Sequence, residues 1–162
     1  MRPILYLDMD EVLVNFESST RIPLEEKKQY NHPRMYDYGF FLELTPVPGA
    51  IEFVEFILKE EYWDVYILTQ PVTNSPSSYA EKAAWVARYL PALKGKIIMT
   101  QDKSLHYGHV LVDDNPKWET FQGKFFLFNK TDSSKEWHRL KLYLIRTRLI
   151  EQLKSLAVKT IL

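Results

Sequence analysis

Short apolar runs recur along the chain and predict the strands of a sheet. They cover residues 4–7, 63–69, 96–100 and 109–113, and residues 124–128 are a candidate fifth. Runs of this length are typical of strands that are buried on both faces of a parallel sheet. We therefore expect four or five parallel strands at the centre of the protein.

Two helical patterns separate these runs. The first helix follows a turn rich in Pro and Gly. Its apolar positions are Ile51, Val54, Ile57 and Leu58. The second helix spans residues 77–90, and its apolar positions are Ala83, Val86, Ala87 and Leu90. Strands that alternate with helices imply right-handed crossovers, so the pattern predicts an α/β fold, a Rossmann-like three-layer arrangement around a parallel sheet.

A third helical pattern occupies residues 135–162. Apolar residues recur there at steps of 3, 4, 4 and 3, at Leu142, Ile145, Leu149, Leu153 and Leu156. We expect this face to pack against the rest of the domain, and the alternative is the interface of a homodimer formed through the helix. The helix is also basic, which would suit anionic lipid or nucleic acid, although we expect a solvated polar face.

Composition narrows the class of protein. A chain of 162 residues with 46% hydrophobic and 26% charged residues is typical of one globular domain. Lys and Arg together number 21, as do Asp and Glu, so a nucleic-acid partner is disfavoured. The absence of Cys excludes disulfides and thiolate metal sites. No apolar run reaches membrane-spanning length, and we expect a soluble, cytoplasmic protein without a membrane partner.

Polar residues gather where the predicted strands end. Asp8 and Asp10 follow the first run, Thr69 ends the second, and Asp113 and Asp114 close the fourth. Taken alone, an Asp-x-Asp pair would more often be a solvated turn or a helix cap. However, ligands of open α/β sheets bind at the carboxyl ends of strands, where these residues converge. Four carboxylates in one crevice repel one another unless a cation is present, and their hard oxygens favour Mg²⁺.

Six segments of the chain form a recognisable set. They are LDMDEVLVNF (7–16), GFFLELTPVPGA (39–50), VYILT (65–69), EKAAWV (81–86), TQDK (100–103) and LVDDN (111–115). Together they resemble the haloacid dehalogenase superfamily of phosphotransferases and, within it, the 5′(3′)-deoxyribonucleotidases. The resemblance covers about residues 3–130, with a gap at 18–38.

The resemblance implies how the chain is organised. The α/β core of haloacid-dehalogenase type would comprise residues 1–16 and 46–132. A small, reduced cap would be inserted after the first strand, at 17–45, and residues 133–162 would form the C-terminal helix. This cap is much shorter than in the nucleotidases, so the site would be more open.

The resemblance also implies a mechanism. Asp8 would attack phosphorus to form an aspartyl-phosphate, and Asp10 would serve as general acid and then as general base. Mg²⁺ would be held by the Asp8 carboxylate, the Asp10 backbone carbonyl and the Asp113 carboxylate. Asp114 would orient the water ligands of the metal. The phosphate would be bound by Thr69, Gln70, Lys82 and Lys103. Without the other motifs, Thr69 would be a strand-end cap and the two lysines surface residues.

Aromatic residues point to the part of the site that would select the substrate. Phe16 matches an aromatic that stacks on the base in the nucleotidases, although an aromatic after an apolar run is more often part of a core. The predicted cap carries Tyr30, Tyr36, Tyr38, Phe40 and Phe41. These side chains could sandwich a base or could attach the cap to the core.

Three positions depart from the pattern of the resembled family. Gln70 stands where a small residue is usual, but its backbone N–H could still bind the phosphate. Glu11 stands where Gly is usual in a tight turn, and we expect its side chain to point away from the metal. Gln101 stands where some members have a basic residue, so one phosphate contact would be missing.

These observations predict an enzyme, a Mg²⁺-dependent phosphomonoesterase acting on a small phosphate ester, a deoxynucleoside monophosphate above all. One alternative is the same chemistry on a sugar phosphate or on the 3′-phosphate of a nucleic-acid end. Another is a module that binds phosphate or a partner without catalysis. The set of Asp8, Asp10, Thr69, Lys103 and Asp113 argues against the last.

Overall fold

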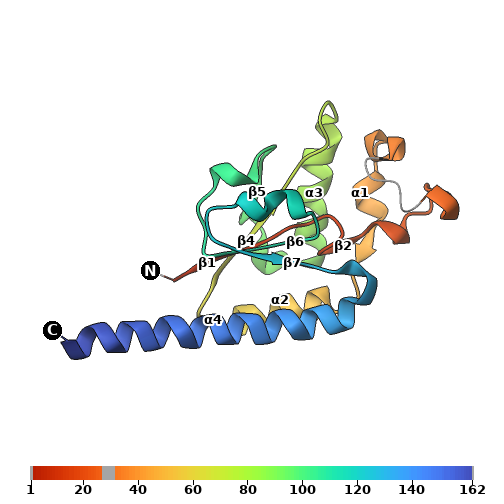
Figure 1. The fold of residues 1–162 in the computed structure, drawn as a ribbon. Coiled ribbons are helices and arrows are strands. Elements are labelled where there is room, and N and C mark those ends of the chain that lie inside the picture. The colour runs from red at the N-terminus through yellow and green to blue at the C-terminus, as the bar shows by residue number, and fades with distance from the viewer. Residues whose placement is uncertain (1, 27–31, 162) are drawn as a thin grey trace.

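Five parallel strands form the central sheet of the protein. The computed structural model describes residues 2–26 and 32–161. The strands are β1 (Ile4–Leu7), β4 (Asp64–Thr69), β5 (Ile97–Met99), β6 (Val110–Asp113) and β7 (Lys124–Leu127). They lie in the order β5-β4-β1-β6-β7, and every neighbouring pair is parallel (Figure 1). The predicted α/β fold with a parallel sheet is confirmed, including the candidate fifth strand.

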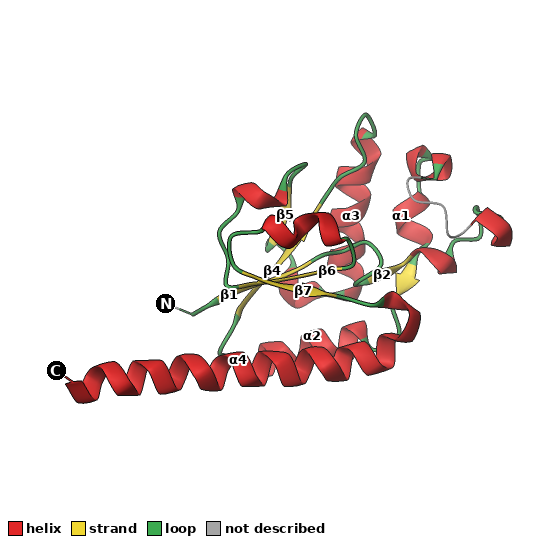
Figure 2. Cartoon of the chain, viewed as in Figure 1, coloured by secondary structure: helices red, strands yellow, loops and turns green. Residues whose placement is uncertain are grey.

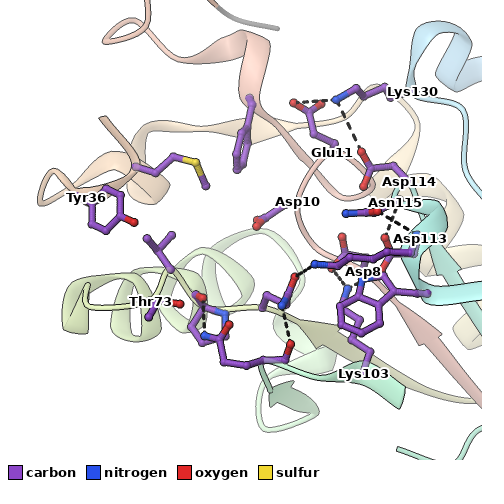
Figure 3. A pocket seen from close by; sticks show the side chains of 18 of the residues that line it. Asp8, Asp10, Glu11, Tyr36, Thr73, Lys103, Asp113, Asp114, Asn115 and Lys130 are labelled. Carbon is purple, nitrogen blue, oxygen red and sulfur yellow. Dashed lines mark hydrogen bonds and ion pairs between the residues drawn. The ribbon is translucent and has the colours of Figure 1, made fainter. Parts of the chain in front are cut away.

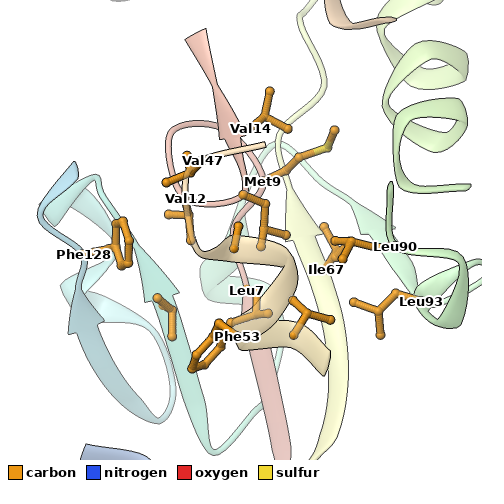
Figure 4. Packing of buried hydrophobic residues seen from close by; sticks show 14 of the residues in the cluster. Leu7, Met9, Val12, Val14, Val47, Phe53, Ile67, Leu90, Leu93 and Phe128 are labelled. Atoms are coloured by element: carbon orange, nitrogen blue, oxygen red, sulfur yellow. The ribbon is translucent and has the colours of Figure 1, made fainter. Parts of the chain in front are cut away.

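The two faces of the sheet are covered differently. The larger apolar cluster joins Leu5 and Leu7 of β1 to the helices α2 (Ala50–Lys59), α3 (Pro76–Tyr89) and α4 (Ser133–Ile161). Figure 4 shows the part of this cluster around Leu7 and Phe53. On the opposite face, Tyr6 packs in a smaller cluster with Trp118 and Phe121 from around the 3₁₀ helix Pro116–Thr120. The third layer is therefore thin on this second face.

Helices α2 and α3 bury only part of the predicted apolar faces, namely Val54, Ile57, Val86 and Leu90. In α2 the buried positions include Phe53, whereas Ile51 and Leu58 are half-buried. In α3 the predicted Ala83 and Ala87 are exposed. Its buried face consists of Ser78, Glu81, Lys82, Trp85 and Val86. Burying Trp85 removes far more apolar surface from water than burying two alanines would, and it brings the neighbouring charged residues inside.

Helix α4 also packs on an unexpected face. Its buried residues are Glu136, Trp137, Leu140, Leu144 and Thr147. Trp137 packs against Phe53 and Phe128, with ring centroids 4.8 and 4.6 Å apart, and donates a hydrogen bond to the Pro48 carbonyl. Leu142, Ile145, Leu149, Leu153 and Leu156 are instead exposed. The prediction that these five pack against the domain is wrong, because Trp137 and its neighbours place the opposite face inward.

The segment between β1 and α2 holds short elements (Figure 2). Its described residues form the two-stranded pair β2 (Val14–Asn15) and β3 (Thr45–Pro46), the short helix α1 (Phe40–Glu43) and three 3₁₀ helices. Phe40 and Phe41 are fully buried, whereas Tyr36 and Tyr38 are exposed. Tyr30 lies outside the described residues. Whether residues 17–45 act as a cap, and where the domain limits fall, stays a prediction.

Within residues 2–26 and 32–161, no helix is both long enough and apolar enough to cross a bilayer.

Candidate active site

Asp8 and Asp113 come together because their strands are neighbours. Strands β1 and β6 pair in parallel with Leu7 beside Val112, so the residues that follow at the carboxyl end are adjacent. The Asp8 N–H donates a hydrogen bond of 2.9 Å to the Val112 carbonyl. Carboxylate oxygens of Asp8, Asp113 and Asp114 lie within 4.8 Å of one another (Figure 3). The sheet thus assembles the acidic cluster at the predicted place.

Lys103 lies between two of these carboxylates. Its Nζ donates hydrogen bonds of 2.5 Å to Asp8 Oδ1 and 2.6 Å to Asp113 Oδ2, and the side chain is almost fully buried. Burial opposes the charge of the ammonium, but Asp8 and Asp113 outweigh that effect and raise the pKa of Lys103 above its ordinary value. Lys103 is therefore a fixed positive charge within the acidic cluster.

Burial also shifts the carboxyl groups of the cluster. It raises the pKa of Asp113 to about 7 and that of Asp114 to about 6, and the neighbouring Asp8 charge adds to both shifts. Lys103 opposes the shift at Asp113, while Lys130, 3.7 Å from Asp114, opposes it there. The cluster consequently holds more negative charge than its cations neutralise at alkaline pH.

Asp10 is held by Lys82 of α3. The fully buried Lys82 donates to Asp10 Oδ2 at 2.6 Å, to Thr69 Oγ1 at 2.9 Å and to the Gln70 carbonyl at 2.7 Å. The other carboxylate oxygen, Asp10 Oδ1, is buried and has no hydrogen-bond partner among the described residues. Burial is the main reason why the pKa of Asp10 lies above its ordinary value. One oxygen of Asp10 is thus anchored and the other is open to a new partner.

A cavity of about 250 Å³ opens above these residues (Figure 3). Its polar floor includes Asp8, Asp10, Lys103, Asp113 and Asp114. An apolar wall is formed by Phe16, Ile22, Met35 and Tyr36. Thr69 and Lys82 are not among the lining residues, because they lie behind Asp10 and Gln70. The cavity therefore combines an anion-handling floor with an apolar side.

Glu11 occupies a glycine-like position. Its φ of 60° lies in the left-handed region, which a non-glycine residue adopts at a cost of about 1–3 kcal/mol. The residue lines the cavity but is not one of the three carboxylates of the acidic cluster, and the expectation that its side chain points away from the metal stays a prediction. Lys130 lies 3.6 Å from its carboxylate, and burial raises the pKa of Glu11 to about 7 (Figure 3).

Gln70 links the end of β4 to two other loops. Its amide Nε2 donates to the Gln101 carbonyl at 2.7 Å, and its Oε1 accepts a hydrogen bond of 2.9 Å from Lys117 Nζ. Gln101 in turn donates to the Pro71 carbonyl. The exposed Lys117 supplies a cation on the cavity wall.

Comparison with known proteins agrees with this geometry. The family model of the 5′ nucleotidase, deoxy (pyrimidine), cytosolic type C proteins matches residues 18–143. A protein of Vibrio phage KVP40 that is assigned to the 5′(3′)-deoxyribonucleotidases is 36% identical over 149 residues, 88% of this chain and 85% of the relative. The chain belongs to this nucleotidase family. Its named members are phosphoric monoester hydrolases, so the predicted family and class of enzyme are confirmed.

Two more comparisons, one with a curated protein and one with a solved structure, illustrate the range of the match. The human cytosolic-type 5′(3′)-deoxyribonucleotidase is 30% identical, over 70% of this chain and 75% of its own. Among solved structures, a class C acid phosphatase from Bacillus anthracis with tungstate bound superposes with a TM-score of 0.52. That match has 18% identity and covers 80% of this chain and 67% of the phosphatase, which supports the fold alone.

The acidic cluster of the nucleotidase fits a divalent metal. Asp8, Asp113 and Asp114 offer three hard oxygen donors at short mutual distances. Burial raises the pKa of the Asp113 and Asp114 carboxyl groups, and the Asp8 charge adds to both shifts. From the sequence we expect metal ligands at Asp8, the Asp10 backbone carbonyl and Asp113, with Asp114 orienting the water ligands of the metal. The cluster instead groups Asp114 with Asp8 and Asp113, and the contribution of the Asp10 carbonyl stays a prediction.

Glu81 supports the site through backbone hydrogen bonds that were not predicted from the sequence. It is buried on α3, where Oε1 accepts a hydrogen bond of 2.7 Å from the Gly39 N–H and Oε2 one of 3.0 Å from the Phe41 N–H. Glu81 therefore anchors the segment before α1 to the helix that carries Lys82. The signal was present in the sequence, since an adjacent Glu-Lys pair shares the face of Trp85.

Phe16 lies where a base could contact it. The half-buried ring lines the cavity and makes edge contacts with Phe40 and Phe41, with centroids 5.6 and 6.0 Å apart. Of the other cap aromatics, Phe40 and Phe41 attach the segment to the nucleotidase core, and Tyr36 lines the cavity.

Proposed function

We propose that this protein hydrolyses deoxynucleoside monophosphates in a Mg²⁺-dependent reaction that passes through a phosphoryl group on Asp8. The observation that carries the proposal is the arrangement of Asp8, Asp10 and Lys103 on the floor of one cavity, beside the acidic cluster. The names of the relatives support the substrate class.

Asp8 acts as the nucleophile. Its carboxylate oxygen forms a bond to phosphorus while the bond from phosphorus to the ester oxygen breaks, so the phosphoryl group moves to Asp8. The Lys103 hydrogen bond fixes the orientation of the attacking carboxylate before substrate arrives. The free nucleoside is the leaving group of this first step.

Asp10 moves the proton in both steps. Its elevated carboxyl pKa favours the protonated form that can donate to the departing ester oxygen through Oδ1, the oxygen without a partner among the described residues. In the second step, deprotonated Asp10 takes a proton from a water molecule that attacks phosphorus. The bond between phosphorus and Asp8 then breaks. Inorganic phosphate is released and the free Asp8 carboxylate is regenerated.

Asp8, Asp113 and Asp114 would hold the magnesium ion. When bound, the ion supplies charge that offsets repulsion between the Asp8 carboxylate and the substrate dianion. Lys103 tethers two of the three carboxylates, so the donor set is oriented in advance.

Thr69 and Lys82 act here chiefly by positioning Asp10. Lys82 joins Asp10 to Thr69 and to the Gln70 carbonyl, and neither Thr69 nor Lys82 lines the cavity. Direct phosphate contacts by Thr69, Lys82 and Lys103, and by the Gln70 backbone, remain the prediction drawn from the family resemblance. Lys117 adds a cation on the wall, where it would meet an anionic substrate.

The apolar wall would receive the base. The wall consists of two aromatic and two aliphatic side chains, Phe16, Tyr36, Ile22 and Met35. A sugar phosphate would leave this wall without a partner, which favours a nucleotide. The segment between β1 and α2 is short and would leave the site open to a larger substrate. The 3′-phosphate of a nucleic-acid end is therefore the second candidate substrate. The cytoplasmic location is likewise a proposal, and a cytosolic-type human relative supports it.

A substrate panel tests the proposal. The purified protein should release phosphate from dUMP or dTMP with Mg²⁺ and not with EDTA, and faster than from a sugar phosphate or a 3′-phosphorylated oligonucleotide. Asp8→Asn should abolish release. Asp64→Asn is the matched control. Asp64 is the first residue of β4 and lies at the amino end of the strand, away from the site, so the substitution should leave activity unchanged. Turnover of the sugar phosphate or the oligonucleotide above that of dUMP would overturn the substrate assignment.

A further inference from the structure

Lys130 is a cation that two carboxylates share. It begins the 3₁₀ helix Lys130–Asp132 after β7, and its Nζ lies 3.6 Å from Glu11 Oε1 and 3.7 Å from Asp114 Oδ2 (Figure 3). Glu11 belongs to the turn after β1, Asp114 directly follows β6, and all three residues line the cavity. The ammonium group therefore joins one carboxylate of the acidic cluster to one that lies outside it.

The contacts of Lys130 differ from those of Lys103, the lysine between Asp8 and Asp113. Lys103 is almost fully buried and donates a short hydrogen bond to each of these two carboxylates. Both Lys130 distances exceed the usual N–H···O range of about 2.7–3.2 Å, and 48% of its side chain is exposed. Lys103 is thus fixed, whereas Lys130 can move toward either of its carboxylates and stay partly solvated.

Glu11 adopts a strained backbone conformation beside the site. Its φ of 60° is left-handed, and its N–H donates a hydrogen bond of 2.8 Å to the Val14 carbonyl, which closes the turn after β1. Only 14% of its side chain is exposed. Strain that persists at a site points to a functional role, because a glycine would adopt the same backbone without strain. The ion pair with Lys130 is a contact that a glycine could not make.

Lys130 and a divalent cation would compete for Asp114. Like charges that approach the same carboxylate repel each other, and the repulsion is stronger in a partly buried site than in water. An ammonium group that stayed beside Asp114 would therefore weaken the binding of the metal. Glu11 offers this group a second carboxylate at nearly the same distance, so Lys130 can leave Asp114 and keep a counter-ion.

We propose that Glu11 and Lys130 together set the affinity of the acidic cluster for its divalent cation. Without metal, Lys130 neutralises part of the charge on Asp114. When the metal binds Asp114, Lys130 shifts to Glu11, which then serves as its counter-ion. Both are positioning residues and not metal ligands. The inference rests on the Mg²⁺ site of the proposed function and adds to that site a pair of residues that tunes its occupancy.

An alternative role for Lys130 is to bind the phosphate of the substrate. Two ionised carboxylates and one ammonium group carry a net negative charge, so this corner of the cavity does not favour an anion. Lys117 is better suited to that role, because its Nζ is held by the neutral side-chain amide of Gln70. The geometry therefore favours a role for Lys130 toward the cation.

Titration with Mg²⁺ alone tests the proposal. The rise of the unfolding temperature with MgCl₂ concentration at pH 8 gives the dissociation constant without substrate or turnover. Lys130→Met should bind Mg²⁺ about fivefold more tightly, because the competing cation is gone, and Glu11→Gln about fivefold more weakly. Lys117→Met is the matched control. This cavity lysine contacts Gln70 and not the acidic cluster, so at physiological salt its loss should change the affinity less than about twofold.

The double variant with Lys130→Met and Glu11→Gln separates two ways in which Glu11 could act. If Glu11 acts through Lys130, adding Glu11→Gln to Lys130→Met should change the Mg²⁺ affinity by less than about twofold. If Glu11 instead attracts the metal directly, Glu11→Gln should weaken binding about fivefold in both backgrounds. That second result would overturn the proposal.

The remaining outcomes separate this inference from the proposed function. A weaker affinity for inorganic phosphate in Lys130→Met, with an unchanged affinity for Mg²⁺, would assign Lys130 to the substrate and overturn the inference. A wild type that binds Mg²⁺ no differently from both single variants would do the same and leave the proposed function intact. A wild type that Mg²⁺ does not stabilise would overturn the proposed metal site, and this inference with it.

Discussion

Lys103 Nζ lies within hydrogen-bond distance of both Asp8 and Asp113, at 2.5 and 2.6 Å. It reaches them from the loop after β5, the outermost strand beyond β4. One buried ammonium group thus joins the two carboxylates that the proposed chemistry needs, the attacking group and a metal donor.

Replacing this lysine should cost both stability and activity. Lys103→Met leaves two buried carboxylates without their cation, so we expect the free energy of unfolding to fall by about 3–5 kcal/mol. Urea denaturation without metal measures this loss. Lys96→Met is the control, because the pair of Lys96 with Asp64 is over a third exposed and is worth less than about 1 kcal/mol. Similar losses in the two variants would contradict this account of Lys103.

Metal-free protein should become less stable as the pH rises. The pKa values of Asp113 and Glu11, about 7, and of Asp114, about 6, lie above their unfolded values, so the folded state binds more protons between pH 5 and 8. Loss of these protons should lower the free energy of unfolding by at least about 1.4 kcal/mol, which corresponds to a pKa difference of one unit at one site.

Thermal or urea unfolding in EDTA at pH 5.5 and pH 8 measures this trend. Mg²⁺ should restore more stability at pH 8 than at pH 5.5, because the cluster is then ionised. Asp113→Asn should flatten the dependence. A metal-free protein that gains stability between the two pH values would contradict the assignment.

The anchor at Glu81 should affect substrate binding more than chemistry. In the wild type, the N–H groups of Gly39 and Phe41 each donate a hydrogen bond to one Glu81 oxygen. Glu81→Gln replaces one of these oxygens by an NH₂ group, so one backbone N–H loses its acceptor. We expect a loss of about 1–3 kcal/mol in stability and a raised KM with a smaller change in kcat. Glu55→Gln, on the exposed face of α2, should change neither. If kcat falls and KM does not change, Glu81 acts on Asp10 through Lys82 rather than on the cavity wall.

Phe16 should select substrates that carry a base. Phe16→Leu keeps an apolar side chain against Phe40 and Phe41 but removes the stacking face. Stacking of a base on an aromatic is worth about 1–3 kcal/mol, so kcat/KM for dUMP should fall about tenfold or more. Hydrolysis of glycerol phosphate, which has no base, is the control and should stay within twofold. An equal fall for both substrates would argue against a base contact.

Periodicity and strand ends were enough to predict the sheet and the position of the acidic cluster. A buried strand is apolar at every position, so its limits are visible in the sequence, and parallel neighbours necessarily end at the same edge. Asp8, Thr69 and Asp113 could be placed for this reason.

The faces of the helices could not be predicted in the same way. Helix α4 carries two apolar stripes, and periodicity cannot tell which of them meets the domain. Packing of Trp137 between Phe53 and Phe128 decides it. In α3, Lys82 is buried only because Asp10, Thr69 and Gln70 satisfy its three donors, and these partners come from distant parts of the chain.

Contacts between loops were also invisible in the sequence. The hydrogen bond from Lys117 to Gln70 joins residues 47 positions apart. Lys130 forms an ion pair with Glu11, and both residues line the cavity. Neither pair lies within a motif, so only the folded chain shows that these cations border the site.

The most direct test of the account is to trap the phosphoryl group on the enzyme. Acid quenching during turnover of dUMP, followed by mass spectrometry of the peptide that contains Asp8, should show that peptide heavier by one phosphoryl group. The adduct and the release of phosphate should both vanish in Asp8→Asn. Continued turnover by Asp8→Asn, or a phosphoryl group found on another residue, would contradict the central claim.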